Sequence, residues 1–138
     1  MLFYPKYSKF KKFQKGSLCN KKISITDIKK QTSNSIKIVS NEHGKLTTKQ
    51  MVAMRFLIRK SIKKKGLAIF KVFPQTIVTK KPAGIRMGKG KGGTSHWICK
   101  VKAGVLLCEI FFKLKLKKRI MRLLRKVQVR LPIKTKIS

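Results

Sequence analysis

The chain has 138 residues, the size of one ordinary domain, and carries 37 Lys and Arg against 3 Asp and Glu, a net charge of +34 at pH 7. A hydrophobic fraction of 42% is enough for a modest core, which excludes a wholly disordered basic tail. A compact body with this charge requires a dense polyanion, and nucleic acid is the natural one. The scarcity of carboxylates removes most routes to acid–base and carboxylate–metal chemistry, so we expect no enzyme and no cofactor.

Membrane and metal partners are also not expected. The longest apolar stretch, 103–112, is interrupted by Glu109 and is far shorter than the roughly 20 residues that span a bilayer. The odd number and wide spacing of Cys19, Cys99 and Cys108 argue against a disulfide framework and favour a reducing compartment. The cysteines and the two histidines lack the spacing of a zinc site.

Residues 1–22 are predicted to form an extended basic arm, because neither helical nor strand periodicity is sustained there. We expect its lysines to bind RNA phosphates: Lys6, Lys9, Lys11, Lys12 and Lys15. Between them stand five aromatic residues: Phe3, Tyr4, Tyr7, Phe10 and Phe13. These rings either stack on bases or anchor the arm to its own domain, and both roles remain open.

A helix is predicted over residues 47–65, after short strands at 23–25 and 36–39 and a turn at 41–44. Thr47 and Gln50 have the spacing of a capping box, and Gly66 is expected to close the helix. Helical spacing places four residues on its buried face: Met51, Met54, Ile58 and Ile62. The outer face is basic, and we predict that four of its side chains bind RNA: Arg55, Arg59, Lys63 and Lys64.

Strands and a second helix are predicted in the rest of the chain. They are a strand at 67–73 ended by Pro74, a loop at about 74–95, strands at 96–101 and 105–111 joined by a turn, a helix from about 114 to 131 ended by Pro132, and a strand at 133–137. The pattern predicts an α+β fold, a single compact domain over 23–138 with a mixed or antiparallel sheet and two helices packed on it. Trp97 is expected in the core, with a base-stacking platform as the alternative.

The loop contains a glycine-rich run at 88–93 that spells G-x-G-x-x-G. A strand rather than a helix follows it, and no acidic residue lies about 20 positions further on, which argues against a dinucleotide site. The run instead offers a flexible backbone that approaches RNA closely, with cationic Arg86, Lys89 and Lys91 beside exposed N–H groups. The alternative is a mobile surface loop without a binding role.

Four segments stand out as a set because of their order and spacing. They are residues 5–16 (PKYSKFKKFQKG), 44–50 (GKLTTKQ), 72–92 with the block RMGKGKG, and 131–135 (LPIKT). Together they closely resemble the L-sixteen family of large-subunit ribosomal proteins, of the bacterial and organellar type. The resemblance covers nearly the whole chain, and the RMGKGKG block is its most specific part.

The resemblance implies an α+β protein seated on large-subunit ribosomal RNA, between the peptidyl-transferase region and the central protuberance. It implies a role in shaping the tRNA-binding A-site region and in late subunit assembly, with neighbouring ribosomal proteins as partners and no homo-oligomer. The arm is expected to thread into RNA, and the loop to reach towards tRNA with these residues: Arg86, Met87, Gly88, Lys89, Gly90, Lys91 and Gly92. Peptide-bond chemistry belongs to the RNA, so no catalytic residue is implied.

The chain also departs from the family pattern. Residues 28–43 are polar where the family has glycine and phenylalanine, and the last helix is almost without acids, so that helix is expected to meet more RNA or a remodelled protein neighbour. Lysine, isoleucine and asparagine, which have A/T-rich codons, and a start close to the family's own start favour a mitochondrially encoded protein, with plastid or bacterial cytoplasm as alternatives. The rival functions are a free-standing RNA-binding or RNA-chaperone protein and a membrane-active cationic amphipath.

Overall fold

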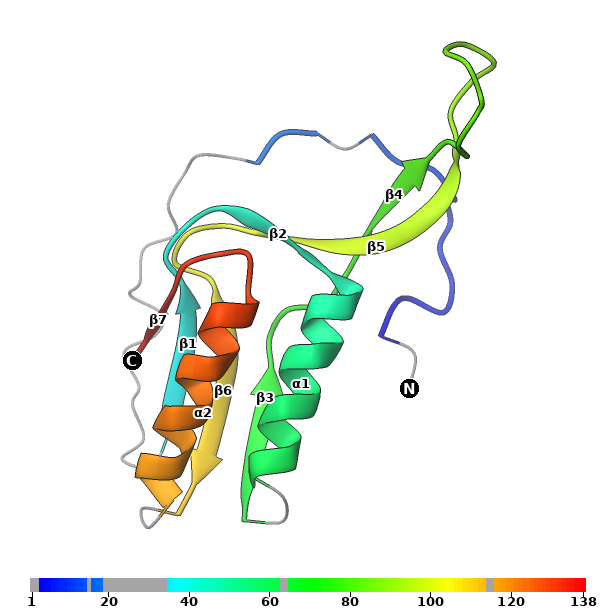
Figure 1. Cartoon of the computed structure of the whole chain (residues 1–138). Coiled ribbons are helices and arrows are strands. Elements are labelled where there is room, and N and C mark those ends of the chain that lie inside the picture. Colours follow the sequence, from blue (N-terminus) through cyan, green and yellow to red (C-terminus); the bar gives the residue numbers. More distant parts are fainter. Residues whose placement is uncertain (1–2, 15, 19–34, 63–64, 114–115) are drawn as a thin grey trace.

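A computed structural model of the chain describes residues 3–14, 16–18, 35–62, 65–113 and 116–138 (Figure 1). Within them, two helices and seven antiparallel strands form one compact α+β domain, which confirms the predicted fold class. Some predictions fall outside the described residues: the strand at 23–25, the arm boundary at residue 22, and the side chains of Lys15, Cys19, Lys63 and Lys64.

A four-stranded sheet forms the body of the domain, and two helices cover one of its faces (Figure 1). Its strands, in spatial order, are β3 (Gly66–Phe70), β6 (Leu106–Phe112), β1 (Ser35–Ser40) and β7 (Thr135–Ile137). The helices are α1 (Thr48–Ile62) and α2 (Lys117–Arg130). The Gln128 amide donates a hydrogen bond of 2.8 Å to the Thr135 carbonyl, which ties the end of α2 to the edge strand β7.

A second sheet extends away from the helices and carries the glycine-rich loop at its far end (Figure 1). Its strands, in spatial order, are β2 (Gly44–Thr47), β5 (Gly93–Val101) and β4 (Thr76–Lys80). β1 continues into β2 and β5 continues into β6, while β1 pairs with β6 and β2 pairs with β5. Both sheets are therefore built on one long antiparallel ribbon.

A corner divides this ribbon, and backbone hydrogen bonds hold it. The Ser40 N–H donates to the Val105 carbonyl over 2.9 Å, and the Gly104 N–H donates to the Ser40 carbonyl over 2.8 Å. The Ala103 N–H donates to Nδ1 of His43 over 3.2 Å, so this histidine serves the corner. The prediction of a single sheet is wrong, because the chain passes from one sheet to the other at this corner, between β1 and β2 and again between β5 and β6.

The loop and its flanking strands also differ from the prediction. The span 74–95 contains β4 and the start of β5, so the loop itself is only 81–92. Proline on both sides of 76–80 resembled loop punctuation, but the β-branched Thr, Ile, Val and Thr between them favour a strand. β3 ends at Phe70 instead of 73, and the strands on either side of the turn near Gly104 pair with other strands, not with each other.

The start of α1 confirms the capping box. The Thr47 N–H donates to Oε1 of Gln50 over 2.9 Å, and the Gln50 N–H donates to Oγ1 of Thr47 over 3.4 Å. The helix ends at Ile62 instead of residue 65, and Gly66 opens β3 instead of closing the helix. A Cβ at Gly66 would lie 2.4 Å from the carbonyl oxygen of Phe111, so close strand packing explains this glycine.

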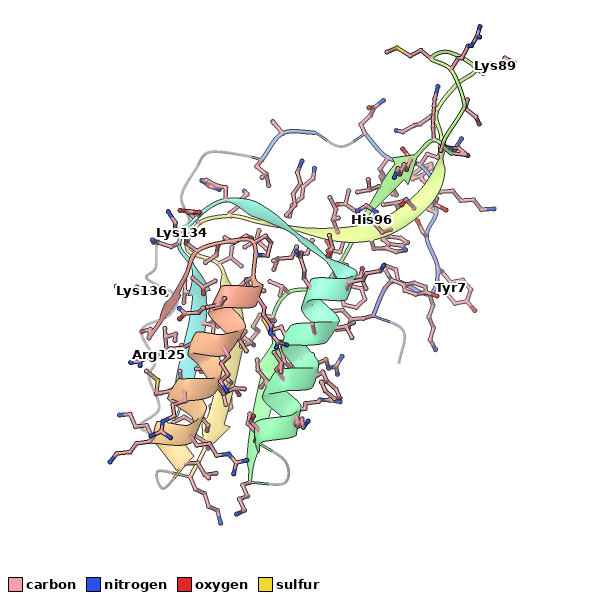
Figure 2. The ribbon with its side chains drawn as sticks, viewed as in Figure 1. Tyr7, Lys89, His96, Arg125, Lys134 and Lys136 are labelled. Atoms are coloured by element: carbon pink, nitrogen blue, oxygen red, sulfur yellow. The ribbon has the colours of Figure 1, made fainter. Side chains whose placement is uncertain are left out.

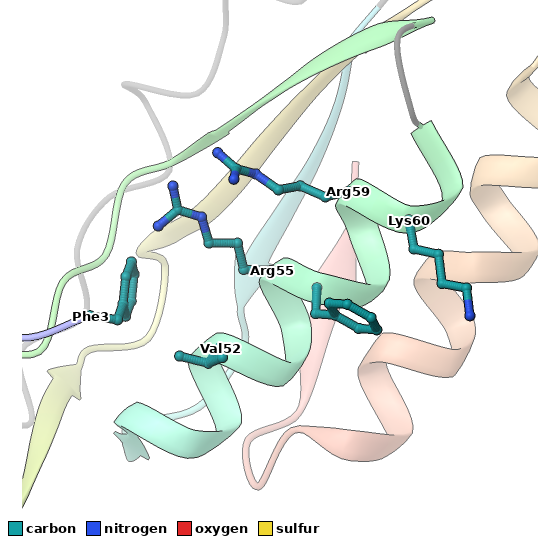
Figure 3. A pocket seen from close by; sticks show the side chains of 6 residues that line it. Phe3, Val52, Arg55, Arg59 and Lys60 are labelled. Atoms are coloured by element: carbon teal, nitrogen blue, oxygen red, sulfur yellow. The ribbon is translucent and has the colours of Figure 1, made fainter. Parts of the chain in front are cut away.

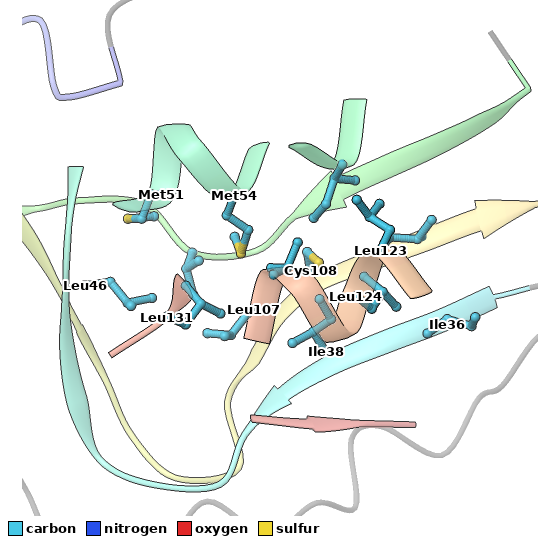
Figure 4. Packing of buried hydrophobic residues seen from close by; sticks show 14 of the residues in the cluster. Ile36, Ile38, Leu46, Met51, Met54, Leu107, Cys108, Leu123, Leu124 and Leu131 are labelled. Atoms are coloured by element: carbon cyan, nitrogen blue, oxygen red, sulfur yellow. The ribbon is translucent and has the colours of Figure 1, made fainter. Parts of the chain in front are cut away.

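The core lies between the helices and the four-stranded sheet (Figure 4). All four residues predicted for the inner face of α1 are buried, and α2 contributes Ile120, Leu123, Leu124 and Val127. They meet sheet residues such as Ile38 and Cys108. Burial raises the pKa of the Cys108 thiol to about 12, so it remains protonated and serves as an apolar side chain.

We expect Leu124→Ala to lower the free energy of unfolding by about 2–5 kcal/mol, because it removes a fully buried side chain from the interface between α2 and the sheet. Urea unfolding followed by circular dichroism measures this. The matched control is Val129→Ala in the same helix, where the side chain is 87% exposed and little change is expected. Equal unfolding midpoints for the two variants would show that α2 does not depend on this packing.

Candidate nucleic-acid interface

The first residues of the arm are fastened to the domain by aromatic contacts. Phe3 meets Phe73 edge to face, with 5.5 Å between ring centroids. Tyr4 stacks on Trp97, with 6.3 Å between centroids and 6° between ring planes. Trp97 is therefore half-buried beneath the arm and lies outside the core, contrary to the sequence prediction. Of the two roles left open for the arm's rings, the contacts of Phe3 and Tyr4 support anchoring.

The aromatic residues further along the arm are in a different situation. Tyr7 is 93% exposed and points away from the domain (Figure 2). Phe10 is exposed as well, and it contacts the ring of Phe13 edge to face, with 6.1 Å between centroids. Exposed aromatic rings beside lysines have the chemistry that stacks on unpaired bases. For Tyr7 and Phe10, base stacking stays a prediction that their exposure supports.

The arm lies against the base of the loop. The Lys12 ammonium donates to the Lys91 carbonyl over 3.0 Å, and the Lys91 ammonium donates to the Phe13 carbonyl over 2.5 Å. Each of these two lysines is thus held by a backbone carbonyl of the opposite segment. We call the exposed cations that the arm and the loop share the arm–loop surface: Lys6, Lys9, Lys11, Lys12, Arg86, Lys89 and Lys91. Within this set the structure joins Lys12 of the arm to Lys91 of the loop, and RNA binding by all seven stays a prediction.

The loop adopts a backbone that needs glycine. Gly84, Gly88 and Gly90 have φ of +86°, +92° and +79°, in the left-handed region, and a Cβ at each would meet no atom within 4 Å. Conformation, not crowding, therefore selects these glycines. Lys89, between two of them, also has a positive φ of +52°.

The tip of the loop is open to a partner. Arg86 is exposed and Met87 is 99% exposed, with Lys89 also at the far end of the loop (Figure 2). A hydrogen bond from the Lys81 ammonium to the Gly88 carbonyl closes the loop across its width. The loop thus presents cationic side chains and an apolar thioether well beyond the sheet.

A cleft of about 550 Å³ lies on the outer side of α1 (Figure 3). Arg55 is only half-exposed there, because its guanidinium lies over the rings of Phe3 and Phe70, 5.3 and 5.7 Å from their centroids. Its Nε is buried and has no hydrogen-bond partner among the described residues. Arg59, also predicted to bind RNA, is exposed at the same cleft. Arg55 therefore joins the arm to the helix, and its contact with RNA stays a prediction.

Sequence reasoning missed the apolar part of this cleft. Phe56 is 64% exposed, and Val52 is exposed one turn earlier on the same face. The sequence did contain a signal for this apolar patch. Val52 and Phe56 are four residues apart, so they share one face of α1, and neither belongs to its buried face. An exposed aromatic ring between Arg55, Arg59 and Lys60 extends the basic and aromatic character of the arm onto the helix.

The two described carboxylates, Glu42 and Glu109, pair with lysines outside these surfaces. Glu109 forms an ion pair of 3.6 Å with the buried ammonium of Lys37, and Glu42 forms one of 3.2 Å with Lys134. Among the described residues, no group of three or more His, Cys, Asp or Glu could hold a metal ion. No helix in the described part of the chain is long and apolar enough to cross a membrane.

A small basic α+β domain that combines an arm, a glycine-rich loop and exposed aromatic rings has the features of a nucleic-acid-binding protein. The sequence matches the family described as Ribosomal protein L16p/L10e over residues 5–138. The chain therefore belongs to the L16p/L10e family of ribosomal proteins, as the sequence motifs predicted.

Curated relatives support this assignment. The large ribosomal subunit protein uL16 of Acinetobacter baylyi is 37% identical over 112 residues, which cover 79% of this chain and 77% of the relative. The protein of the same name from Chlamydia trachomatis serovar L2 is 38% identical over 109 residues, with the same coverage.

We expect Gly92→Ala to disturb the base of the loop, because a Cβ there would lie 2.6 Å from the carbonyl oxygen of Lys80 on the opposite side. Faster hydrogen exchange of the β4–β5 backbone amides would report the loosened pairing, by about ten-fold for a loss near 1.4 kcal/mol. The neighbouring Gly93→Ala is the control, because a Cβ at that position meets nothing within 4 Å. Identical exchange in both variants would contradict the close approach at Gly92.

Proposed function

We propose that this protein is a structural constituent of the large ribosomal subunit and that it binds large-subunit ribosomal RNA through the arm–loop surface and the outer face of α1. The observation that carries the proposal is the contact between Lys12 and Lys91, which joins arm and loop into one cationic surface. Phosphates neutralise such a surface and release condensed counterions, so affinity falls steeply with salt. Family membership supports the same partner.

The loop tip is the part of this surface that reaches tRNA. Arg86 and Met87 stand at the exposed end of a loop that is fixed at its base by the arm and by β4 and β5. A rigid base with an exposed cationic tip suits contact with a ligand that enters and leaves, such as tRNA in the A-site region. Ribosomal RNA, by contrast, would hold the arm permanently.

The role is one of positioning. Lysine and arginine neutralise phosphates, exposed rings stack on bases, and the folded domain sets the distance between arm and loop tip. The lysine-rich composition supports a mitochondrial ribosome as the location, with plastid and bacterial ribosomes as the alternatives. Neighbouring large-subunit proteins complete the surroundings of the chain.

Sedimentation tests the proposal. A lysate of cells that express the full chain is separated on a sucrose gradient, with and without ribonuclease, and the chain is quantified in each fraction by mass spectrometry. We expect the chain to migrate with the large subunit and to leave that position after RNA digestion. A chain at the top of the untreated gradient would point to the free-standing RNA-binding or RNA-chaperone alternative, and one that pellets with lipid despite ribonuclease to a membrane-bound role.

Separate variants should separate the two parts of the surface. Lys9→Gln, Lys11→Gln and Lys12→Gln together should lower incorporation into large subunits by about ten-fold or more, because three phosphate contacts are lost. Arg86→Ala should leave incorporation intact and weaken A-site tRNA binding by about five-fold. Lys45→Gln, Lys102→Gln and Lys136→Gln together remove three exposed charges elsewhere and provide the control. Equal losses in all three variants would contradict a division of labour between arm and loop.

A further inference from the structure

The exposed side of α2 is a second strongly basic surface. Seven of the fourteen residues in this helix are Lys or Arg, and all seven are exposed: Lys117, Lys118, Arg119, Arg122, Arg125, Lys126 and Arg130. Helical spacing gathers most of them into one stripe, opposite the buried residues of the helix. We call this stripe the α2 basic face.

The α2 basic face is costly for the isolated protein. Lys118, Arg122 and Lys126 follow one another at i, i+4 spacing, where like charges repel. The first turn contains three cations and no acid, at the end of the helix where the backbone dipole is already positive, and Leu116 provides no side-chain cap.

No carboxylate compensates these charges within the described part of the chain. The helix itself contains none, and the ion pairs of Glu42 and Glu109 involve Lys134 and Lys37 instead. A solvated helix face usually alternates positive and negative residues, which the same-sign face of α2 does not. Asp27, outside the described residues, is the one further carboxylate in the sequence, so most of the compensation for seven cations must come from outside the chain.

A groove gives this face a shape. It lies where α2 meets α1, has a volume of about 570 Å³, and is lined by four cations with Ser61 and Leu123: Lys118, Arg119, Arg122 and Lys126. Lys118, Arg122 and Lys126 follow one another at intervals of four residues, about 6 Å along the helix axis, with Arg119 beside the first of them. A groove of this kind can hold a chain of anionic groups side by side.

We propose that the α2 basic face and its groove bind the sugar–phosphate backbone of RNA, as a docking surface separate from the arm–loop surface. The inference rests on the proposed function, because the partner is RNA of the same particle. The helix has no aromatic residue, so it offers no platform for bases and makes contacts that do not depend on sequence. A protein partner fits less well, because the buried centres of protein interfaces are depleted in charged residues, and Val129 is the one strongly exposed large apolar residue described on α2.

The two surfaces lie on different sides of the molecule. Arg125 marks the α2 basic face, and Lys89 marks the loop at the far end of the second sheet (Figure 2). One RNA segment that follows the arm and the loop would therefore have to leave that surface to reach α2. The protein would thus be clamped between two RNA elements.

Lysine acetylation of intact large subunits tests the inference. Subunits that contain the full chain are treated with an amine-acetylating reagent, and the modified lysines are identified by mass spectrometry. We expect Lys118 and Lys126 to react at least ten-fold more slowly in the subunit than in the free chain, and ultraviolet irradiation to attach nucleotides to peptides of α2.

The outcomes separate the inference from the proposed function. Rapid acetylation of Lys118 and Lys126 in subunits where Lys9, Lys11 and Lys12 are protected would overturn the α2 site and leave the proposed function standing. Protection of α2 with crosslinks to another protein and none to nucleotides would also overturn it, in favour of an acidic neighbour. Absence of the chain from the subunit would overturn both.

Variants of the full chain provide a second test, with a 20-base-pair RNA duplex as the probe. Lys118→Gln, Arg122→Gln and Lys126→Gln together should weaken binding about ten-fold and make the slope of log affinity against log salt shallower by about 2.7, because three phosphate contacts are lost. The control is the triple variant at Lys45, Lys102 and Lys136. An equal loss in the control would overturn the inference.

The melting temperature of the variant shows whether weaker binding in this second test comes from unfolding. The α2 variant removes like-charge repulsion, so its melting temperature should equal or exceed that of the parent chain, and weaker binding cannot then be assigned to unfolding. Should the variant melt lower, the acetylation and crosslinking of the unmodified chain still decide the inference.

Discussion

Three carboxylates must serve 37 lysine and arginine side chains, and this shortage governs the rest of the structure. The two described carboxylates, Glu42 and Glu109, are both used for ion pairs, and the second of these neutralises a lysine inside the sheet. A buried ammonium without a partner would strongly destabilise the fold, so Lys37 requires the carboxylate of Glu109. Most of the other described cations are exposed on the surface, where water and salt screen them. The fold therefore concentrates its apolar residues in one core and leaves its outer faces to be neutralised by a polyanion.

The corner in the antiparallel ribbon determines where the basic loop lies relative to the core. Because β1 and β6 continue into β2 and β5, the core beneath the helices is covalently and geometrically continuous with the sheet that carries the loop. The loop cannot shift without bending β4 and β5, and the arm adds a second attachment through Phe3, Tyr4 and Lys12. A loop rich in glycine would be flexible alone, but its base is fixed from two sides. The core thus determines where the loop lies, and the exposed loop tip makes the contact with a partner.

Local patterns predicted the helices well, because helical periodicity and the Thr47–Gln50 capping box are properties of neighbouring residues. They predicted the sheet less well. The corner depends on pairings between Ser40, Gly104 and Val105, which are distant in sequence, and β4 was hidden by the prolines around it. The same difference applies to the interface: lysine-rich segments were visible in the sequence, but the role of Arg55 beneath Phe3 and the stacking of Tyr4 on Trp97 require the tertiary structure.

The two basic surfaces differ in how far their cations are held in place before RNA binds. On the arm–loop surface, backbone carbonyls hold Lys12 and Lys91 and the ring of Phe10 lies under Lys9, so RNA would meet a partly organised site. On α2, the cations repel one another along the helix and oppose its dipole, so RNA would also relieve a strain that the free chain carries. Binding at α2 is thereby linked to the stability of the helix, and through Leu123, Leu124 and Val127 to the core. A polyanion bound to α2 would therefore stabilise the four-stranded sheet beneath the helix. The second sheet, which carries the loop, is joined to that sheet by the antiparallel ribbon.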